Sequence, residues 1–441
     1  MKPLGWFGIV RLGLVQMALG AIVVLTTSTL NRVMVVELAL PALVPGLLVG
    51  LHHLVQLARP RLGYGADQGG RCTPWIVGGM AVLGAGGALA ALGVAWAGTA
   101  RGPGMALVTL AYALVGLGVA GAGTALLVLL AKRVPEGRRA GAATLVWMMM
   151  IAGFAITAGL AGRALDPYSP ERLVAVSGTV SLLAWIVTVL AVWGVERSAV
   201  SATDAPAPHE RTDFRAALRE VWAEPVARRF TVFVAASMLA FSAQDLILEP
   251  FAGVVYGLGP GATTRLSGLQ HGGVFAGMLA AGLAGRRGFG SLRAWTVGGC
   301  LASALALAGL CAAGFLGGTW PLHATVFALG AANGAFSIAA IGSMMRLAGS
   351  GRGHREGTRM GLWGAAQAIA FGAGGLLGAA ASDLVRLVLP SAGEAYAVVF
   401  GAEAMLFVLS ARLAAGIEAE PPLAGKAGEP WQQPITPTMP S

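Results

Sequence analysis

Long apolar runs occupy most of the 441-residue chain. A helix that crosses the hydrocarbon core of a bilayer, about 30 Å thick, needs about 20 residues, and the runs divide into twelve segments of that length. The predicted spanning helices cover residues 11–36, 41–65, 74–97, 103–131, 140–164, 173–195, 229–257, 264–285, 295–317, 321–348, 359–383 and 396–416. The composition, with only 11% charged residues, leaves no polar stretch long enough for a separate catalytic domain. We therefore predict an all-α integral membrane protein that is not an enzyme.

The predicted helices form two groups of six, separated by one polar stretch. The predicted parts are an N-terminal six-helix bundle at 1–195, a cytoplasmic linker at 196–228, a C-terminal six-helix bundle at 229–416 and a tail at 417–441. In the linker, Phe214, Leu218 and Val221 recur at helical spacing, which predicts a short helix on the membrane surface. The tail carries prolines without apolar periodicity, which predicts disorder.

Positive charges are distributed unevenly among the predicted loops. With the N-terminus inside the cell, 24 of the 30 Lys and Arg residues fall on the cytoplasmic side and six on the other side. Because cytoplasmic loops of membrane proteins are enriched in Lys and Arg, this split predicts that both termini are cytoplasmic. The net charge of +10 therefore reflects topology, and we expect the lipid bilayer and no nucleic acid as its partner.

Motifs for soluble cofactors are missing or misplaced in the sequence. The three cysteines form no CxxC pair, which suggests neither a disulfide framework nor a direct metal site. No lysine belongs to a GxxxxGK[ST] run, so the phosphate-binding loop of ATPases is absent from the sequence. The stretch 116–121 matches GxGxxG, but it lies inside a predicted spanning helix with no preceding strand. We therefore reject a dinucleotide site.

Three short motifs recur in the same order at an offset of 218 to 220 residues. The pairs are LVGLHH at 48–53 with LSGLQH at 266–271, WIVGG at 75–79 with WTVGG at 295–299, and EGRRAG at 136–141 with EGTRMG at 356–361. Parallel repeats of six helices are the architecture of the major facilitator superfamily, which the chain resembles. The expected fold is twelve transmembrane helices in two pseudo-symmetric six-helix bundles.

The loop after the second predicted helix supports the same resemblance. Gly63, Asp67, Gly70 and Arg71 have the spacing of the superfamily's GxxxDxxGR loop. Glycine permits close helix crossing, and an aspartate is favourable at a helix N-terminus. The resemblance implies a gating or structural role for this loop.

Polar side chains in the first and seventh predicted helices are the main candidates for a site inside the membrane, because ionisable groups there are costly. In the superfamily these two helices line a central cavity. The predicted polar cavity cluster consists of Asn31, Arg32, Glu37, Gln244, Asp245 and Glu249. Asp245 and Glu249 are four residues apart and so share a helix face. Three roles stay open: an ion pair with Arg32, a contact to substrate or pigment, and a proton-coupling carboxylate.

Three segments resemble those of one family within the superfamily. They are TTSTLNRVMVVEL at 26–38, RPRLG at 59–63 and FSAQDLILEPFAG at 241–253. In these segments the chain is similar to the PucC/LhaA family, the bacteriochlorophyll-delivery branch. The resemblance implies an assembly factor for bacterial light-harvesting antenna complexes. Members are thought to hand bacteriochlorophyll to antenna polypeptides or to escort those polypeptides into the membrane.

Four further residues are candidates for binding such a pigment. His53 and His271 are equivalent in the repeat and lie near mid-membrane. A neutral imidazole at either position has the chemistry to ligate a chlorin magnesium, with hydrogen bonding between helices as the alternative. Trp147 and Trp363 lie inside predicted helices, where stacking on a pigment competes with core packing.

Three functions remain open on the sequence. The first is an assembly factor that binds or delivers bacteriochlorophyll, its cofactor, and antenna α/β polypeptides. The second is a proton-coupled transporter of a small solute, and the third is a scaffold that binds pigment-synthesis enzymes and antenna chains without pigment. Further partners that the resemblance implies are the core photosynthetic complex and bacteriochlorophyll synthase. The resemblance implies a multi-pass protein of the bacterial inner, intracytoplasmic photosynthetic membrane.

Overall fold

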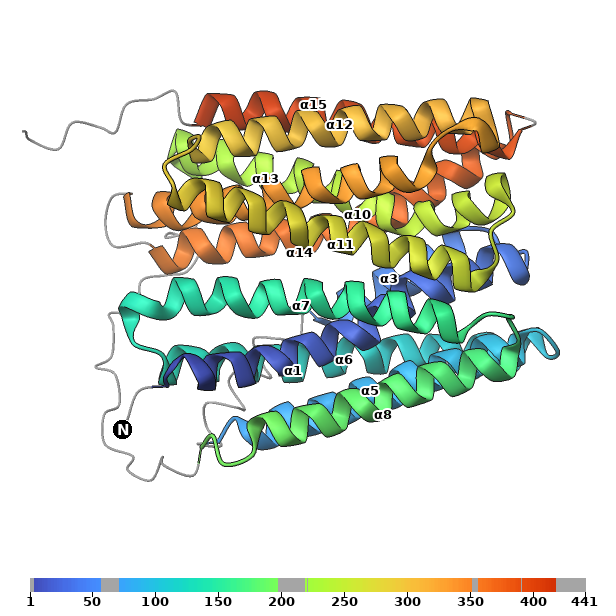
Figure 1. The fold of residues 1–441 in the computed structure, drawn as a ribbon, viewed down its shortest axis with the longest axis horizontal. Coiled ribbons are helices and arrows are strands. Elements are labelled where there is room, and N and C mark those ends of the chain that lie inside the picture. The colour runs from blue at the N-terminus through green and yellow to red at the C-terminus, as the bar shows by residue number, and fades with distance from the viewer. Residues whose placement is uncertain are drawn as a thin grey trace, which may run out of the picture.

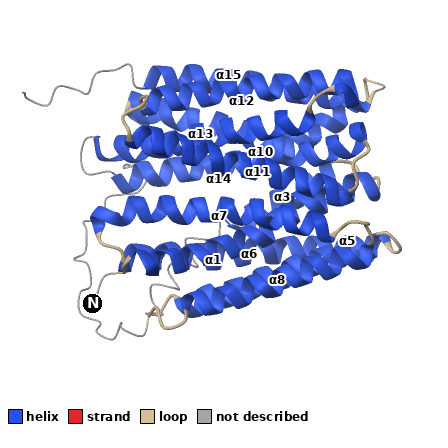
Figure 2. Cartoon of the chain, viewed as in Figure 1, coloured by secondary structure: helices blue, strands red, loops and turns tan. Residues whose placement is uncertain are grey.

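The computed structural model describes residues 4–56, 71–196, 219, 221–350, 356–389 and 391–417. Helices make up the ordered secondary structure of these residues, without a strand among them (Figure 2). The helices of the first half are α1 (Trp6–Val24), α2 (Leu30–Arg32), α3 (Leu43–Val55), α5 (Thr73–Ala97), α6 (Arg101–Arg133), α7 (Glu136–Ala164) and α8 (Pro170–Val192). The helices of the second half are α10 (Pro225–Tyr256), α11 (Pro260–Arg286), α12 (Leu292–Leu316), α13 (Leu322–Ser350), α14 (Glu356–Arg386) and α15 (Ala392–Ile417).

Each predicted spanning segment corresponds to a helix of the described chain. Ten of these helices are long and apolar enough to cross a membrane. The other two are α3, which is described only to residue 56, and α11, which carries a buried polar face with Thr263, Thr264 and Gln270. Helix α10 begins at Pro225, before the predicted start at 229, because proline suits the first turn of a helix. Most of the predicted linker, with its surface helix, and the predicted tail from 418 onward lie outside the described residues.

The first predicted helix is longer and less regular than expected. α1 continues through a π-helical segment η1 (Leu25–Thr29), the short α2 and a second π-helical segment η2 (Val33–Glu37). π-Helical turns are rare and are frequent at functional sites. Ser28 and Thr29 lie in η1 and Glu37 in η2, while Asn31 and Arg32 lie in the short α2 between the two π-helical segments.

The helices pack as two six-helix bundles, one below the other in Figure 1. In the N-terminal bundle α5 packs on α6 and α8, and α1 packs on α7 and α8. In the C-terminal bundle α11 packs on α13, α12 on α13 and α15, and α10 on α14 and α15. Two seams join the bundles, one between α7 and α11 and the other between α3 and α14. The two seams are equivalent under the repeat, because α3 corresponds to α11 and α7 corresponds to α14.

Glycines bring helix backbones together within the C-terminal bundle. A Cβ at Gly330 would lie 2.1 Å from the Gln270 carbonyl oxygen, and one at Gly334 would lie 2.0 Å from the Val274 carbonyl oxygen. α13 therefore contacts α11 through its backbone, which is how helices associate closely in lipid. Gly374 makes the same kind of contact from α14 to α10.

Candidate functional site

Hydroxyl and amide side chains from the first spanning helix join the two bundles. The Ser28 hydroxyl contacts the Glu249 carboxylate and lies 2.9 Å from the Ser267 hydroxyl. One residue further, the Thr29 hydroxyl lies 3.0 Å from that of Thr264. All of these side chains are buried. These contacts lie toward the end of the helices that is opposite to residues 4 and 417, and we call that end of the molecule the distal end.

Asn31 extends this polar contact to α10, since its Nδ2 donates to the Leu246 carbonyl oxygen at 2.5 Å. Leu246 follows Asp245 directly, so the predicted cavity residues of the two helices do lie close together. Tyr112 of α6 donates to the Thr26 carbonyl oxygen at 2.5 Å. This carbonyl belongs to η1, where π-helical geometry alters the usual backbone pairing.

Arg32 forms its ion pair with Glu37, and not with Asp245 or Glu249 as the sequence allowed. The reason is local: the two residues are five apart, and a π-helical turn places residues five apart above one another. Arg32 Nη2 also donates to the Leu258 carbonyl oxygen at 2.7 Å. The guanidinium is therefore held at the distal end of α10, with 3% of the side chain exposed.

The two acids of α10 find neutral partners instead. Asp245 accepts a hydrogen bond from Gln270 Nε2 at 3.2 Å, and Glu249 contacts Ser28. Both partners lie at the junction with α11, since Gln270 belongs to α11 and Ser28 also contacts Ser267. Gln244 is fully buried, and neither of its amide atoms has a hydrogen-bond partner among the described residues.

The candidate histidines lie in different seams between the bundles. His53 of α3 packs against α14, with its ring centroid 6.1 Å from that of Phe371. His271 of α11 meets Phe154 of α7 edge-on, with ring centroids 4.9 Å apart. The repeat predicted that the two histidines are equivalent. His53 lies in the α3–α14 seam and His271 in the α7–α11 seam, and the repeat relates these two seams.

His271 has the tautomer that a metal ligand needs. Its Nδ1 lies 2.9 Å from the Ser267 carbonyl oxygen, which can only accept a hydrogen bond. Nδ1 therefore carries the hydrogen, and Nε2 keeps the lone pair. Among the described residues no group of three or more His, Cys, Asp or Glu side chains could hold a metal ion. A single axial nitrogen donor fits a metal that arrives inside a macrocycle, so the donor chemistry at His271 suits a chlorin.

The two candidate tryptophans differ in burial. Trp363 is 1% exposed and packs edge-on against Phe230, with ring centroids 4.8 Å apart. It is thus part of the C-terminal core, the packing alternative that the sequence left open. Trp147 is 37% exposed on α7, so its ring lies at the surface of the bundle.

Of the predicted gating loop, Gly63, Asp67 and Gly70 lie outside the described residues, and Arg71 is exposed just before α5. Beside it, the Glu196 carboxylate accepts hydrogen bonds from the backbone N–H groups of Cys72 at 2.7 Å and Thr73 at 2.8 Å. Partial burial acts to raise the pKa of Glu196, but these two backbone hydrogen bonds and the charge of Arg71 lower it overall. Glu196 therefore fixes the start of α5.

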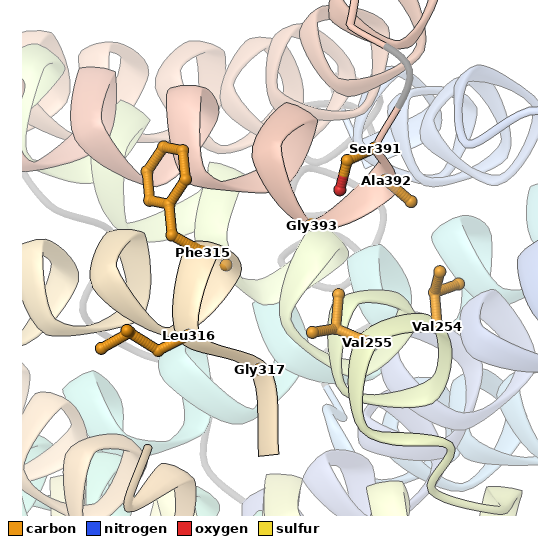
Figure 3. Close-up of a pocket in the computed structure, with 9 residues that line it drawn as sticks. Val254, Val255, Phe315, Leu316, Gly317, Ser391, Ala392 and Gly393 are labelled. Carbon is orange, nitrogen blue, oxygen red and sulfur yellow. The ribbon is translucent and has the colours of Figure 1, made fainter. Parts of the chain in front are cut away.

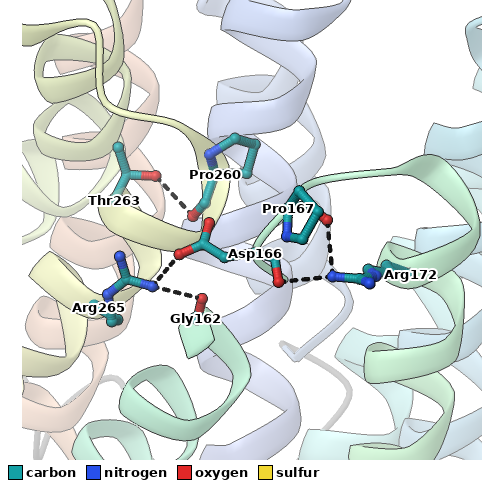
Figure 4. A network of polar contacts seen from close by, with 7 residues as sticks. All are labelled: Gly162, Asp166, Pro167, Arg172, Pro260, Thr263 and Arg265. Atoms are coloured by element: carbon teal, nitrogen blue, oxygen red, sulfur yellow. Dashed lines mark hydrogen bonds and ion pairs between the residues drawn. The ribbon is translucent and has the colours of Figure 1, made fainter. Parts of the chain in front are cut away.

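Two carboxylates join the bundles at the distal end, and sequence reasoning missed both. Asp166, after α7, forms an ion pair with Arg265 of α11, and Arg265 Nη1 also donates to the Gly162 carbonyl oxygen at 3.0 Å (Figure 4). Asp383 of α14 accepts from the backbone N–H groups of Ala42 at 3.0 Å and Leu43 at 2.7 Å. The two aspartates are separated by nearly the repeat offset, a signal that was present in the sequence.

Glu403 of α15 is a further buried acid that sequence reasoning missed. It is 2% exposed, and neither carboxylate oxygen has a hydrogen-bond partner among the described residues. The rule that ionisable residues in spanning segments mark functional sites would have found it, since it lies inside the predicted helix 396–416.

Two cavities lie away from these residues. One, of about 360 Å³, lies at the distal end of the C-terminal bundle between Val255, Phe315 and Ser391 (Figure 3). The other, of about 380 Å³, is an apolar groove on α5 and α6 beside Trp75, Gly78 and Leu117. Neither cavity is lined by a histidine or by a member of the polar cavity cluster.

The two bundles and the polar residues between them define a membrane protein with the fold of the major facilitator superfamily. A bacterial homologue of the human lysosomal transporter Spinster, inward-facing and unoccupied, superposes with a TM-score of 0.68 at 15% identity, covering 93% of this chain and 96% of that one. A peptide transporter in complex with sulfate gives a TM-score of 0.69 at 14% identity, covering 95% and 97%. At these identities the likeness concerns the fold.

The sequence comparisons specify the family. The family model described as PUCC protein matches residues 29–420. The "Bacteriochlorophyll synthase 44.5 kDa chain" of Rhodobacter capsulatus is 55% identical over 419 residues, which cover 94% of this chain and 96% of that protein. "Protein PucC" of Cereibacter sphaeroides is 30% identical over 427 residues, covering 91% and 90%. The chain belongs to the PucC family.

Proposed function

We propose that this protein is an assembly factor for light-harvesting antenna complexes, which binds or delivers bacteriochlorophyll and antenna polypeptides within the membrane. The observation that carries the proposal is the match to the PucC family over residues 29–420. A relative that is 55% identical is named for bacteriochlorophyll synthesis. We propose that this chain itself performs no catalysis, because its fold is that of the solved transporters on which it superposes.

The physical chemistry of the pigment favours a carrier embedded in the bilayer. A chlorin with a long hydrocarbon tail is too apolar to cross water, so it has to move laterally between proteins. When bound, its magnesium would accept one axial nitrogen donor. In this chain His271 offers Nε2, held in place by the Nδ1 contact to Ser267 and by Phe154. His53 offers the equivalent position in the other seam.

The proposed partners follow from the same family. They are the antenna α/β polypeptides, the core photosynthetic complex and bacteriochlorophyll synthase. We place the protein in the photosynthetic inner membrane with both termini cytoplasmic, which agrees with its uneven Lys and Arg distribution.

The test is purification of the full-length protein with its pigment from a photosynthetic host. We expect co-purified chlorin absorbance that falls about tenfold in His271→Ala, since loss of one ligand worth about 1.4 kcal/mol changes affinity tenfold. His53→Ala reports on the second seam. His323→Ala is the matched control, because His323 is exposed on α13. Unchanged pigment content in both seam variants would exclude ligation by these histidines.

The same preparations separate the assembly factor from a scaffold. An assembly factor that holds pigment should lose both pigment and pigment-dependent antenna binding in the double variant His53→Ala/His271→Ala. A scaffold should retain antenna chains at the wild-type level without any pigment.

A proton-coupled transporter of a small solute is the second candidate, favoured by the solved transporters of this fold, by the half-buried Asp245 and by the buried Glu249. Uptake into proteoliposomes should then respond to a pH gradient and disappear in Asp245→Asn. Absence of gradient-driven uptake for a panel of small solutes would leave the assembly function as the better account.

A further inference from the structure

Three oxygen-bearing side chains meet around Glu249 between the two bundles. The Ser28 hydroxyl of the first spanning helix contacts Glu249 Oε1 on α10, and it also lies 2.9 Å from the Ser267 hydroxyl on α11. Only 7% of Ser28, 1% of Glu249 and 2% of Ser267 is exposed. The cluster therefore combines oxygens from both bundles in a place that the surrounding helices enclose.

The two serines do not satisfy an ionised Glu249 carboxylate. Each hydroxyl carries a single hydrogen. One hydrogen serves the contact between Ser28 and Glu249 Oε1, and the other serves the contact between the two serines. The second carboxylate oxygen, Oε2, is buried without a hydrogen-bond partner among the described residues. Because an unpaired oxygen of a buried carboxylate is costly, the cluster favours a ligand that brings positive charge to Oε2.

The nearby arginine does not neutralise Glu249. Arg32 lies about one helical turn away, since a Cβ at Gly253, four residues after Glu249, would lie 3.2 Å from Arg32 Nε. Arg32 forms its ion pair with Glu37 and donates a hydrogen bond to the Leu258 carbonyl oxygen. The negative charge of Glu249 therefore remains for a ligand to balance.

The donor set suits a small monovalent metal ion. Carboxylate and hydroxyl oxygens bind hard cations, whereas softer metals prefer nitrogen and sulfur. No group of three His, Cys, Asp or Glu side chains that could hold a metal ion exists in the described part of the chain. Divalent cations typically take more than one acidic ligand, and the positive charge of Arg32 close by also disfavours them. The short separation of the two serine oxygens, 2.9 Å, favours Na⁺ over the larger K⁺.

We propose that Glu249, Ser28 and Ser267 form a sodium-binding site between the two bundles. Thr263 precedes Ser267 by four residues on α11, so it adds a buried hydroxyl to the same helix face. That hydroxyl donates to the Pro260 carbonyl oxygen at 3.1 Å and keeps its lone pairs (Figure 4). A proton also neutralises a carboxylate, but it bonds to one oxygen, whereas a metal ion contacts several oxygens at once.

The backbone at the cluster has the irregularity that sodium sites in membrane transporters use. Ser28 lies in the π-helical η1, and irregular segments of spanning helices offer backbone carbonyl oxygens to ions. One carbonyl of η1, that of Thr26, already bonds a side chain, the Tyr112 hydroxyl. Since the ligands come from both bundles, bound sodium links the two halves and stabilises the closed distal end. This inference goes beyond the proposed assembly function and does not depend on pigment.

Thermal unfolding of the full-length, pigment-free protein in detergent tests the site. We expect the melting temperature to rise saturably with NaCl and not with choline chloride at equal ionic strength, because an ion that binds the folded state stabilises it. KCl should give a smaller rise at the same concentration. Glu249→Gln should abolish the sodium-specific rise. Ser28→Ala should require about tenfold more sodium, which corresponds to about 1.4 kcal/mol for one ligand.

Ser237→Ala is the matched control on α10, because the Ser237 hydroxyl is buried and bonds the Phe233 carbonyl oxygen within its own helix. This variant should keep the sodium response of the wild type. A folded Glu249→Gln with an undiminished sodium response would overturn the proposal.

Binding of radioactive sodium to the unmodified wild type keeps the proposal testable if a variant fails to fold. We expect one saturable site per chain, displaced by unlabelled NaCl and not by choline chloride. Absence of saturable sodium binding would also overturn the proposal and leave a proton as the ligand of Glu249. Neither result bears on the pigment content that tests the assembly function.

Discussion

Several buried polar residues of this protein have a partner on a second helix. Ser28 and Glu249 show the pattern, since each would be costly alone in an apolar bundle and the Ser28 hydroxyl contacts one carboxylate oxygen of Glu249 across the two halves. Removing one partner leaves the other buried and unpaired, at a typical cost of about 1–3 kcal/mol. Polar side chains between the two halves thus define how the bundles meet.

Glu196 gives a pH-dependent prediction at this scale. Its folded-state pKa lies below the ordinary value of 4.5, so its contribution is present above that pH and is lost as the pH falls through the folded-state pKa. Glu196→Ala should cost about 1 kcal/mol near neutral pH, the usual worth of a helix cap. Melting curves of the wild type and of Glu196→Ala in detergent, at neutral pH and near pH 4, measure this loss of stability.

Glu196→Gln is the matched control, because glutamine keeps an acceptor oxygen but does not titrate in this range. It should retain part of the cap and show a weaker pH dependence than the wild type. An equal loss of stability in Glu196→Ala at both pH values would contradict the role of the charge.

At the scale of elements, glycine contacts set how closely the helices of the C-terminal bundle pack. α11 and α13 meet backbone to backbone at Gly277, Gly330 and Gly334, where a side chain would collide with a carbonyl group. Packing of this kind provides much of the association between helices in lipid, where apolar burial contributes little. The π-helical segments of the first helix are the other departure from regular geometry.

Gly277→Ala should therefore destabilise the bundle. A Cβ at this position would lie 1.9 Å from the Ala331 carbonyl oxygen, so α11 and α13 would have to separate. We expect a loss of about 1–3 kcal/mol, typical of overpacking, measured as a lower melting temperature and a lower yield of folded protein. Gly272→Ala on the same helix is the control, because no atom lies within 4 Å of its Cβ position. Equal stability of the two variants would rule out this contact as the cause.

At the scale of the whole molecule, the two bundles form a pseudo-symmetric pair whose seams differ in chemistry. Asp166 meets Arg265 at the start of α11, whereas Asp383 caps the start of α3 through two backbone N–H groups. α3 and α11 are equivalent helices of the repeat. Each half therefore uses a carboxylate at equivalent positions to hold the second helix of the other half at the distal end.

Asp166→Asn/Asp383→Asn should weaken closure of the distal end. The exposed ion pair is worth about 0–1 kcal/mol and the cap about 1 kcal/mol. Their combined loss shifts the balance between closed and open forms roughly tenfold, since about 1.4 kcal/mol corresponds to that factor. Spin labels at exposed Thr99 and Thr319, in a cysteine-free background, report the distance between the distal loops of the two bundles.

We expect a population with a longer distance between the spin labels in the double variant. Glu171→Gln should show no such population, because Glu171 is an exposed acid in the first turn of α8, also at the distal end. An unchanged distance distribution in the double variant would show that other contacts close this end.

The amino-acid sequence by itself determined the class of this protein. Long apolar runs demand spanning helices, because backbone groups must be satisfied within each helix in lipid, and a repeat of about 220 residues predicted two related halves. The polar residues of the first and seventh spanning helices were identified because charge in such helices is costly. These are local properties of the chain, readable along a single helix.

Only the tertiary structure decided which partner each polar residue has. The π-helical turn directs Arg32 to Glu37, Trp363 is enclosed by the C-terminal core, and the two candidate histidines lie in separate seams. Helix periodicity gives the face on which a residue lies, whereas its neighbour depends on which helices meet and at what depth, and these follow from packing across the whole chain.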